Sequence, residues 1–296
     1  MEYVLTLDCP ERLGIVHAVT GFLLEAGCDI VDSKQFDDRR DGHFCLRLEV
    51  AGPEPAAESS ASEAGTGDPG AELGRLRAGF EPIAAEYGMT WTLQPRGTRT
   101  RVLIMVSRFG HCLNDLLYRT RNGELPIEIV AVVSNHEDHA GLVGWHSIPF
   151  FHVPVTAATK PAAEARLLDL VDRFDAELVV LARYMQVLSD ELSAALSGRC
   201  INIHHSFLPS FKGAKPYHQA WERGVKMVGA TAHYVNAELD EGPIIAQQVI
   251  DVDHTHAPED LVAVGRDAEV AALTRAVRWH AEGRVVLRGQ RTVVLR

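Results

Sequence analysis

The chain has 296 residues, of which 46% are apolar and 23% are charged, so it is long enough for two domains with buried cores. Acidic residues outnumber Lys and Arg by 40 to 29, which gives a formal net charge of −11 and argues against nucleic-acid or membrane-surface partners. The five cysteines are scattered with no Cys-x-x-Cys pair, a pattern of free thiols in a reducing compartment. With neither a signal peptide nor an apolar run of membrane-spanning length, we expect a cytoplasmic protein.

The first part of the chain alternates in the order β-α-β-β-α-β. Strands are expected at 3–9, 28–38, 43–50 and 89–95, and helices at 11–27 and 76–88. This order predicts a ferredoxin-like domain over residues 1–95. Residues 52–74 consist largely of Gly, Pro, Ser, Ala and Glu, which predicts a surface loop inside this domain rather than a linker. The linker is expected at 94–100.

The second part, residues 101–296, contains short strands that are apolar on both faces. These strands are expected at 101–107, 127–135, 148–155, 177–184 and 201–205, and helices at 112–121 and 161–174 come between them. Such strands predict a mostly parallel, Rossmann-like sheet in an α/β domain, covered on both sides. Ligands bind at the carboxyl ends of the strands in such sheets.

The densest polar cluster follows the fifth of these strands. Asn202 and His204 alternate with Ile201 and Ile203, so both polar side chains lie on one face of the strand. An amide and an imidazole there can polarise a carbonyl and stabilise an oxyanion. The alternative is a pair of core residues that hydrogen-bond to loop backbone.

Asp240 lies in an acidic turn that Gly242 and a proline close. Acids in turns commonly cap the turn through local hydrogen bonds. Beside Asn202 and His204, however, this carboxylate would orient the imidazole and accept a proton from water.

Several long segments carry a resemblance to a known family. They are SRFGHCLNDLLYR (107–119), VAVVSNH (130–136), WHSIPFFHVPV (145–155), VVLARYMQVLS (179–189) and HHSFLPSFKGAKPYHQA (204–220). They resemble the formyltransferase-fold enzymes that use 10-formyltetrahydrofolate, and most of all the formyltetrahydrofolate deformylase family. Residues 1–95 resemble an ACT domain, the regulatory domain that deformylases also carry.

The resemblance implies a hydrolase that releases formate and tetrahydrofolate, supplies formate for purine synthesis and balances the one-carbon folate pools. It implies that Asn202, His204 and Asp240 are catalytic and that His233 is a second histidine of the site. It also implies folate binding at Met185, Gln186, Val187 and Leu188, at the loop 237–240 and at Gly242. Phe109 and His111 are expected to fill the place of an amine acceptor and to leave room only for water. Lys212 and Lys215 either face the glutamate tail of the folate or lie in a solvated loop.

The ACT resemblance implies an amino-acid effector, glycine or methionine, near Gly14 and Ile15, with a dimer or tetramer as the assembly. Retention of this domain for oligomerisation alone is the alternative. We expect neither a metal nor a cofactor, since the histidines between 136 and 152 match no metal-binding motif. Cys112 is interpreted as a structural thiol.

Two other functions stay open on the sequence. One is a formyltransferase that passes the formyl group to an amine, and formate release without an acceptor would distinguish it. The other is a non-catalytic protein that senses folate or an amino acid, for which ligand would bind without turnover.

Overall fold

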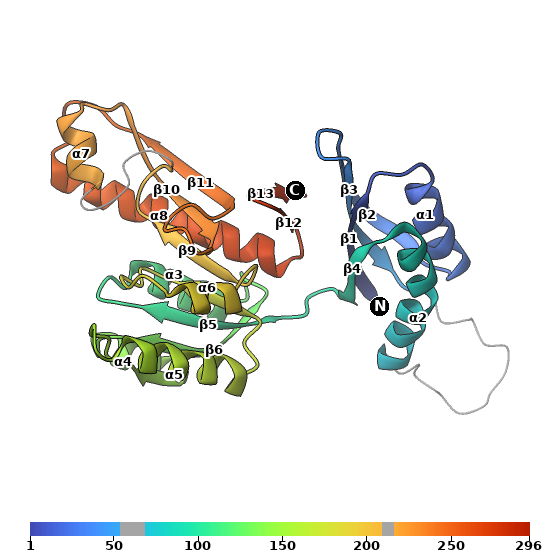
Figure 1. Ribbon diagram of the computed structural model, residues 1–296, viewed down its shortest axis with the longest axis horizontal. Helices are drawn as coiled ribbons and strands as arrows, with labels where there is room; N and C mark the ends of the chain where they lie inside the picture. The colour runs from blue at the N-terminus through green and yellow to red at the C-terminus, as the bar shows by residue number, and fades with distance from the viewer. Residues whose placement is uncertain (54–68, 209–215) are drawn as a thin grey trace. The chain divides into compact units, whose positions relative to one another are not determined.

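The chain folds into two compact units (Figure 1). The computed structural model describes residues 1–53, 69–208 and 216–296. The first unit consists of Met1–Thr98 with Gly283–Val286 and Val293–Arg296, and the second of Arg99–Glu282 with Leu287–Thr292. The sequence-based division places all of 101–296 in the second domain, whereas these two short C-terminal segments pack with the first unit.

The first unit has the predicted ferredoxin-like arrangement. Its elements are β1 (Glu2–Pro10), α1 (Ile15–Glu25), β2 (Asp29–Asp38), β3 (His43–Ala51), α2 (Pro69–Tyr87) and β4 (Thr90–Pro95). The strands pair antiparallel in the order β2-β3-β1-β4. The surface loop was predicted to extend to residue 74, but helix α2 already begins at Pro69. Residues 54–68 of this loop lie outside the described part of the chain.

The core of this unit lies between its helices and one face of its sheet. Alternate residues of β1 and β3, such as Leu5 and Leu48, pack with Val19 of α1 and Phe80 of α2. Period-two alternation on the strands and helical spacing on α1 and α2 together produce this single apolar layer. The predicted helices end where expected, with Gly27 and Gly88 in the left-handed conformation just after α1 and α2.

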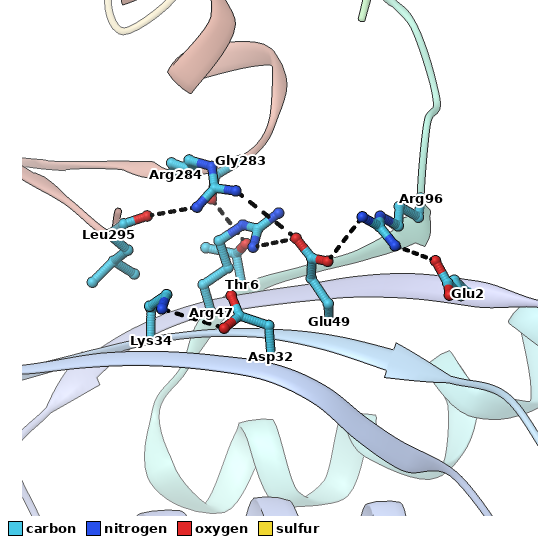
Figure 2. A network of polar contacts seen from close by, with 10 residues as sticks. All are labelled: Glu2, Thr6, Asp32, Lys34, Arg47, Glu49, Arg96, Gly283, Arg284 and Leu295. Carbon is cyan, nitrogen blue, oxygen red and sulfur yellow. Dashed lines mark hydrogen bonds and ion pairs between the residues drawn. The ribbon is translucent and has the colours of Figure 1, made fainter.

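The C-terminal segments pack on the sheet of the first unit through both apolar and charged contacts. Val286 and Leu295 bury their side chains with Cys45 of β3. Figure 2 shows the polar network beside this contact, centred on Glu49 of β3. The Glu49 carboxylate lies 2.9 Å from Arg47 Nη1, 3.4 Å from Arg96 Nη2 and 3.9 Å from Arg284 Nη2. Thr6 Oγ1 also donates a hydrogen bond of 3.1 Å to the carbonyl oxygen of Gly283.

The second unit is built on a seven-stranded sheet within the described residues. Its strands are β5 (Thr100–Val106), β6 (Ile127–Ser134), β7 (Phe150–His152), β8 (Leu178–Leu181), β9 (Cys200–His204), β10 (Met227–Tyr234) and β11 (Ile244–Asp251). They lie in the order β11-β10-β9-β8-β5-β6-β7. The five strands from β9 to β7 are parallel to one another. Strand β10 pairs antiparallel with β9 on one side and with β11 on the other. The predicted mostly parallel sheet is therefore confirmed.

Helices cover the sheet of the second unit. They are α3 (His111–Arg121), α4 (Ala140–Trp145), α5 (Lys160–Arg173), α6 (Asp190–Ala195), α7 (Pro216–Glu222) and α8 (Pro258–Ala281), and the short hairpin β12 (Val285–Arg288) and β13 (Arg291–Val294) follows α8. Helices α5 and α6 share a buried core with β5, β6, β8 and β9, while α8 packs on α3, β9, β10 and β11. None of the described helices is long and apolar enough to cross a membrane.

Candidate active site

A cavity of about 430 Å³ lies beyond the carboxyl ends of β8 and β9. Its walls include the turn Met185–Leu188 after β8, Asn202 and His204 of β9, His233 of β10, and Asp240. Parallel strands carry their binding sites at this end, so the topology of the sheet brings these distant residues together.

Asn202, His204 and Asp240 form a contiguous polar group. Asn202 and His204 lie on one face of β9, as their alternation predicts, and Asp240 lies in the turn between β10 and β11. His204 Nδ1 is 3.2 Å from Asp240 Oδ2, and the ring is 5% exposed. His204 Nε2 is buried without a hydrogen-bond partner among the described residues, so this nitrogen remains for a substrate atom or water.

His233 lies directly opposite Asn202 in the antiparallel pairing of β9 with β10. Its Nδ1 is 2.9 Å from the carbonyl oxygen of Tyr234, and its Nε2 is 3.2 Å from Asn202 Nδ2. A carbonyl only accepts, so Nδ1 carries the proton and Nε2 accepts from the amide. This arrangement orients the Asn202 amide and leaves its second N–H available.

The backbone around Asp240 is constrained. Asp240 has a φ of 58°, in the left-handed region that few residues other than glycine adopt. A Cβ atom at Gly242 would lie 1.7 Å from the carbonyl oxygen of Tyr234, so only glycine lets this turn fold back on β10. Gly242 therefore shapes the turn that carries Asp240, although it does not line the cavity.

The carboxylate of Asp240 is ionised at neutral pH. Burial opposes its ionisation, but the hydrogen bond from His204 and the electrostatic effect of the nearby His204 and His233 rings outweigh burial and hold the pKa of Asp240 well below its usual value. The contact with His204 is the tighter of the two, because His233 Nε2 is 3.8 Å away. The site thus holds a permanent anion beside an imidazole.

The turn after β8 is anchored from two neighbouring strands. Ser107, which follows β5, accepts a hydrogen bond of 2.9 Å from the Met185 amide and donates one of 2.7 Å to Asn135 Oδ1, which follows β6. Met185 and Val187 remain more than half exposed. An exposed apolar turn with fixed backbone suits recognition of a flat ring through the main chain.

Phe109 and His111 lie beside the cavity wall, but neither is among the residues that line the cavity. The ring of Phe109 faces the guanidinium of Arg183 at 5.4 Å. His111 Nε2 is 2.7 Å from the carboxylate of Glu269. Both side chains thus contact other residues of the protein, and the structure does not place them in the cavity where an acceptor was expected.

Three residues near the cavity were missed in the sequence analysis: Arg183, His205 and Glu269. Arg183 and His205 line the cavity, and they lie two residues and one residue after the ends of β8 and β9, which is the signal that could have identified them. Glu269 is buried within the long helix α8, and nothing in the pattern of that helix distinguishes it.

The remaining candidate residues lie elsewhere. Gly14 adopts a φ of 97° at the start of α1, as a tight turn requires, while Ile15 is buried in the core of the first unit. Lys212 and Lys215 lie outside the described residues.

Comparison with known proteins matches both the sequence and the fold of this chain. Residues 100–277 match the model of the formyl transferase family. The whole chain is 62% identical over 296 residues to the formyltetrahydrofolate deformylase of Corynebacterium sp. (strain P-1), 99% of which is covered. The chain belongs to the formyltetrahydrofolate deformylase family. The resemblance noted in the sequence is thereby confirmed.

Further members of the deformylase family match both units of the chain. The formyltetrahydrofolate deformylase of Bacillus subtilis is 42% identical over 293 residues, which cover 98% of this chain and 92% of that protein. The crystal structure of the Burkholderia mallei deformylase has a TM-score of 0.91 at 50% identity and covers 100% of this chain and 99% of its own. The glycinamide ribonucleotide transformylase of Symbiobacterium toebii, with a TM-score of 0.63 at 33% identity, covers only 68% of this chain. Similarity across both units thus distinguishes the deformylases from the transformylases.

Proposed function

We propose that this chain hydrolyses 10-formyltetrahydrofolate to formate and tetrahydrofolate at the cavity formed by Asn202, His204 and Asp240. The observation that carries this proposal is the ionised Asp240 carboxylate 3.2 Å from His204 Nδ1, on the wall of a cavity large enough for a folate ring system. The relatives also support the proposal, because proteins that match nearly the full chain are named formyltetrahydrofolate deformylase.

The proposed chemistry uses only side chains of this chain and water. Attack of water on the formyl carbon places negative charge on the formyl oxygen, and the free N–H of Asn202 and a protonated His204 stabilise it. Water loses a proton as the new C–O bond forms, and Asp240 orients the water and accepts that proton while His204 stays protonated. The C–N10 bond then breaks, N10 gains a proton, and formate leaves.

The direct test replaces Asp240 by asparagine and measures formate release without an amine acceptor. Asparagine tolerates the left-handed backbone of this position, so the turn should keep its shape while the charge is lost. We expect kcat to fall by about 100-fold or more. Glu241→Gln, an exposed neighbour in the same turn, serves as the matched control and should keep nearly full activity.

Two results would contradict this proposal. An Asp240→Asn variant that turns over at the rate of the unmodified chain would remove Asp240 from the chemistry. An unmodified chain that releases no formate, but formylates an added amine, would make it a transferase.

We further propose that the first unit senses an amino acid, glycine or methionine, and that the chain works in the cytoplasm as a homodimer or tetramer. The backbone at the start of α1, with Gly14 in the left-handed conformation, offers amide groups to a carboxylate. All five cysteines are free, which suits a reducing compartment. Light scattering of the chain, with and without each amino acid, tests the assembly.

A further inference from the structure

A buried carboxylate lies close to the cavity but outside the group of Asn202, His204 and Asp240. Glu269, in the middle of α8, is 2% exposed. A buried charge is costly unless other groups compensate it. The neighbours of Glu269 therefore indicate what it does.

Three side chains from three other segments meet this carboxylate. His111 Nε2, at the first residue of α3, is 2.7 Å from Oε2, and Arg183 Nε, after β8, is 3.3 Å from the same oxygen. The hydroxyl of Tyr217 in α7 donates a hydrogen bond of 3.3 Å to Oε1. Burial opposes ionisation of Glu269, but the His111 hydrogen bond and the charge of Arg183 lower its pKa, so the group is an anion.

Helix α8 is shaped for one of these contacts. Gly265 precedes Glu269 by four residues, so it lies one turn away on the same helix face. A Cβ atom at Gly265 would lie 2.2 Å from the hydroxyl oxygen of Tyr217. The glycine therefore leaves the space through which Tyr217 reaches Glu269.

A metal ion is a poor occupant of this cluster. His111, Cys112 and Glu269 do bring potential ligand atoms within 4.8 Å of one another. Arg183, however, already supplies the positive charge at Glu269. Burial, and then the charge of Glu269, raise the pKa of Cys112, which keeps the thiol protonated.

Arg183 connects the cluster to the cavity. It lines the cavity, its backbone has a φ of 63°, and its guanidinium faces the ring of Phe109. His205 lies on the same wall, and its ring centre is 5.1 Å from that of His204. A shift of Arg183 would therefore change both the shape and the charge of the wall beside His204.

We propose that Glu269 is a positioning residue of the active site, which fixes Arg183 at the wall of the cavity beside His204 and holds His111 next to it. This role rests on the hydrolysis proposed above. Glu269 acts through Arg183, because its own carboxylate is occupied by its three partners and lines no part of the cavity. Its loss should impair turnover more than folate binding, which the proposed contacts of Met185–Leu188 supply.

The test compares Glu269→Gln with Asp267→Asn, an exposed carboxylate two residues away on the same helix. For each variant, kcat and KM for 10-formyltetrahydrofolate are measured, and tetrahydrofolate binding is titrated. We expect Glu269→Gln to lower kcat about 10- to 100-fold, as a displacement of about 1 Å near reacting atoms does. KM and the affinity for tetrahydrofolate should stay within about threefold of the unmodified chain.

The control separates this inference from the proposed function. Formate release by the unmodified chain and by Asp267→Asn, with kcat unchanged in Glu269→Gln, would overturn the positioning role and leave the hydrolase intact. A loss of kcat matched by an equal loss of binding-competent protein would also overturn it, because that is the signature of a purely structural residue. If Glu269→Gln does not fold, Arg183→Lys, which keeps the charge but loses the planar guanidinium, should show the same selective loss of kcat. An unchanged kcat in Arg183→Lys would overturn the role.

Discussion

Two residues at the cavity adopt a backbone conformation that is unfavourable for their type. Arg183 and Asp240 have φ values of 63° and 58°, and such positions cost on the order of 1 kcal/mol or more. Each is held by its contacts, Arg183 by Glu269 and Asp240 by His204. Strain of this kind persists where the surrounding structure enforces it, and here it places one cation and one anion at the same cavity.

His205 should make the chain sensitive to acid. Burial, followed by repulsion from Arg183 and His204, lowers the pKa of His205 to about 4. Between pH 6.5 and 4 the unfolded chain therefore binds a proton at this residue that the folded chain does not, so the free energy of unfolding falls as the pH is lowered. His205 should account for about 2 kcal/mol of the loss between pH 7 and pH 4.5.

Urea unfolding at these two pH values measures this effect. His205→Asn should lose about 2 kcal/mol less stability than the unmodified chain between pH 7 and 4.5. His254→Asn, at an exposed histidine, should lose as much as the unmodified chain. Equal losses in all three proteins would show that His205 titrates normally in the folded state.

At the scale of elements, the long and regular segments could be predicted from the sequence. The sequence shows clear apolar runs at β5, β6 and β8 and a clear helical period at α5. These patterns are reliable because the strands are buried along their length and the helix is buried along one full face. The short helices α4, α6 and α7 were not predicted, since six or seven residues carry too little periodicity.

The candidate site also contains residues that could be predicted from the sequence and residues that could not. Asn202 and His204 were expected together because they alternate on one strand, and the family resemblance added Asp240; the structure places all three around one cavity. The contact of Glu269 with His111 spans 158 residues in sequence. No local pattern encodes such a contact, since it depends on how α8 packs against α3.

The hairpin β12–β13 provides a prediction for the first unit. Glu49 faces three guanidinium groups, among them Arg284 just before β12 and the 3%-exposed Arg47. Glu49→Gln removes the carboxylate that these guanidinium groups share, and the loss of one partner of a buried ion pair costs about 3 kcal/mol. Hydrogen exchange of residues 283–296 should therefore speed up by at least about tenfold, because the segments dock less stably.

An exposed ion pair of the same network is the matched control. Lys34 and Asp32 lie 3.3 Å apart and are both about one-third or more exposed, so Asp32→Asn should change the exchange of 283–296 little. Equal acceleration in both variants, or none in Glu49→Gln, would show that Glu49 does not hold the C-terminal segments.

At the scale of the whole molecule, the chain combines a ferredoxin-like unit with a formyltransferase-fold unit, and deformylases of 62% and 42% identity match it over nearly its full length. All residues proposed for the chemistry, and the Glu269 cluster, lie in the second unit. The proposed amino-acid sensing and assembly concern the first unit. Water is the proposed acceptor of the formyl group.

That claim is tested most directly by turnover of 10-formyltetrahydrofolate in ¹⁸O-labelled water without any amine. Hydrolysis at the formyl carbon keeps the formyl oxygen and adds one oxygen from water. We predict formate that carries a single ¹⁸O atom, released by the unmodified chain and reduced about 100-fold or more in rate by Asp240→Asn. Absence of labelled formate, with the formyl group recovered on an added amine instead, would contradict the account.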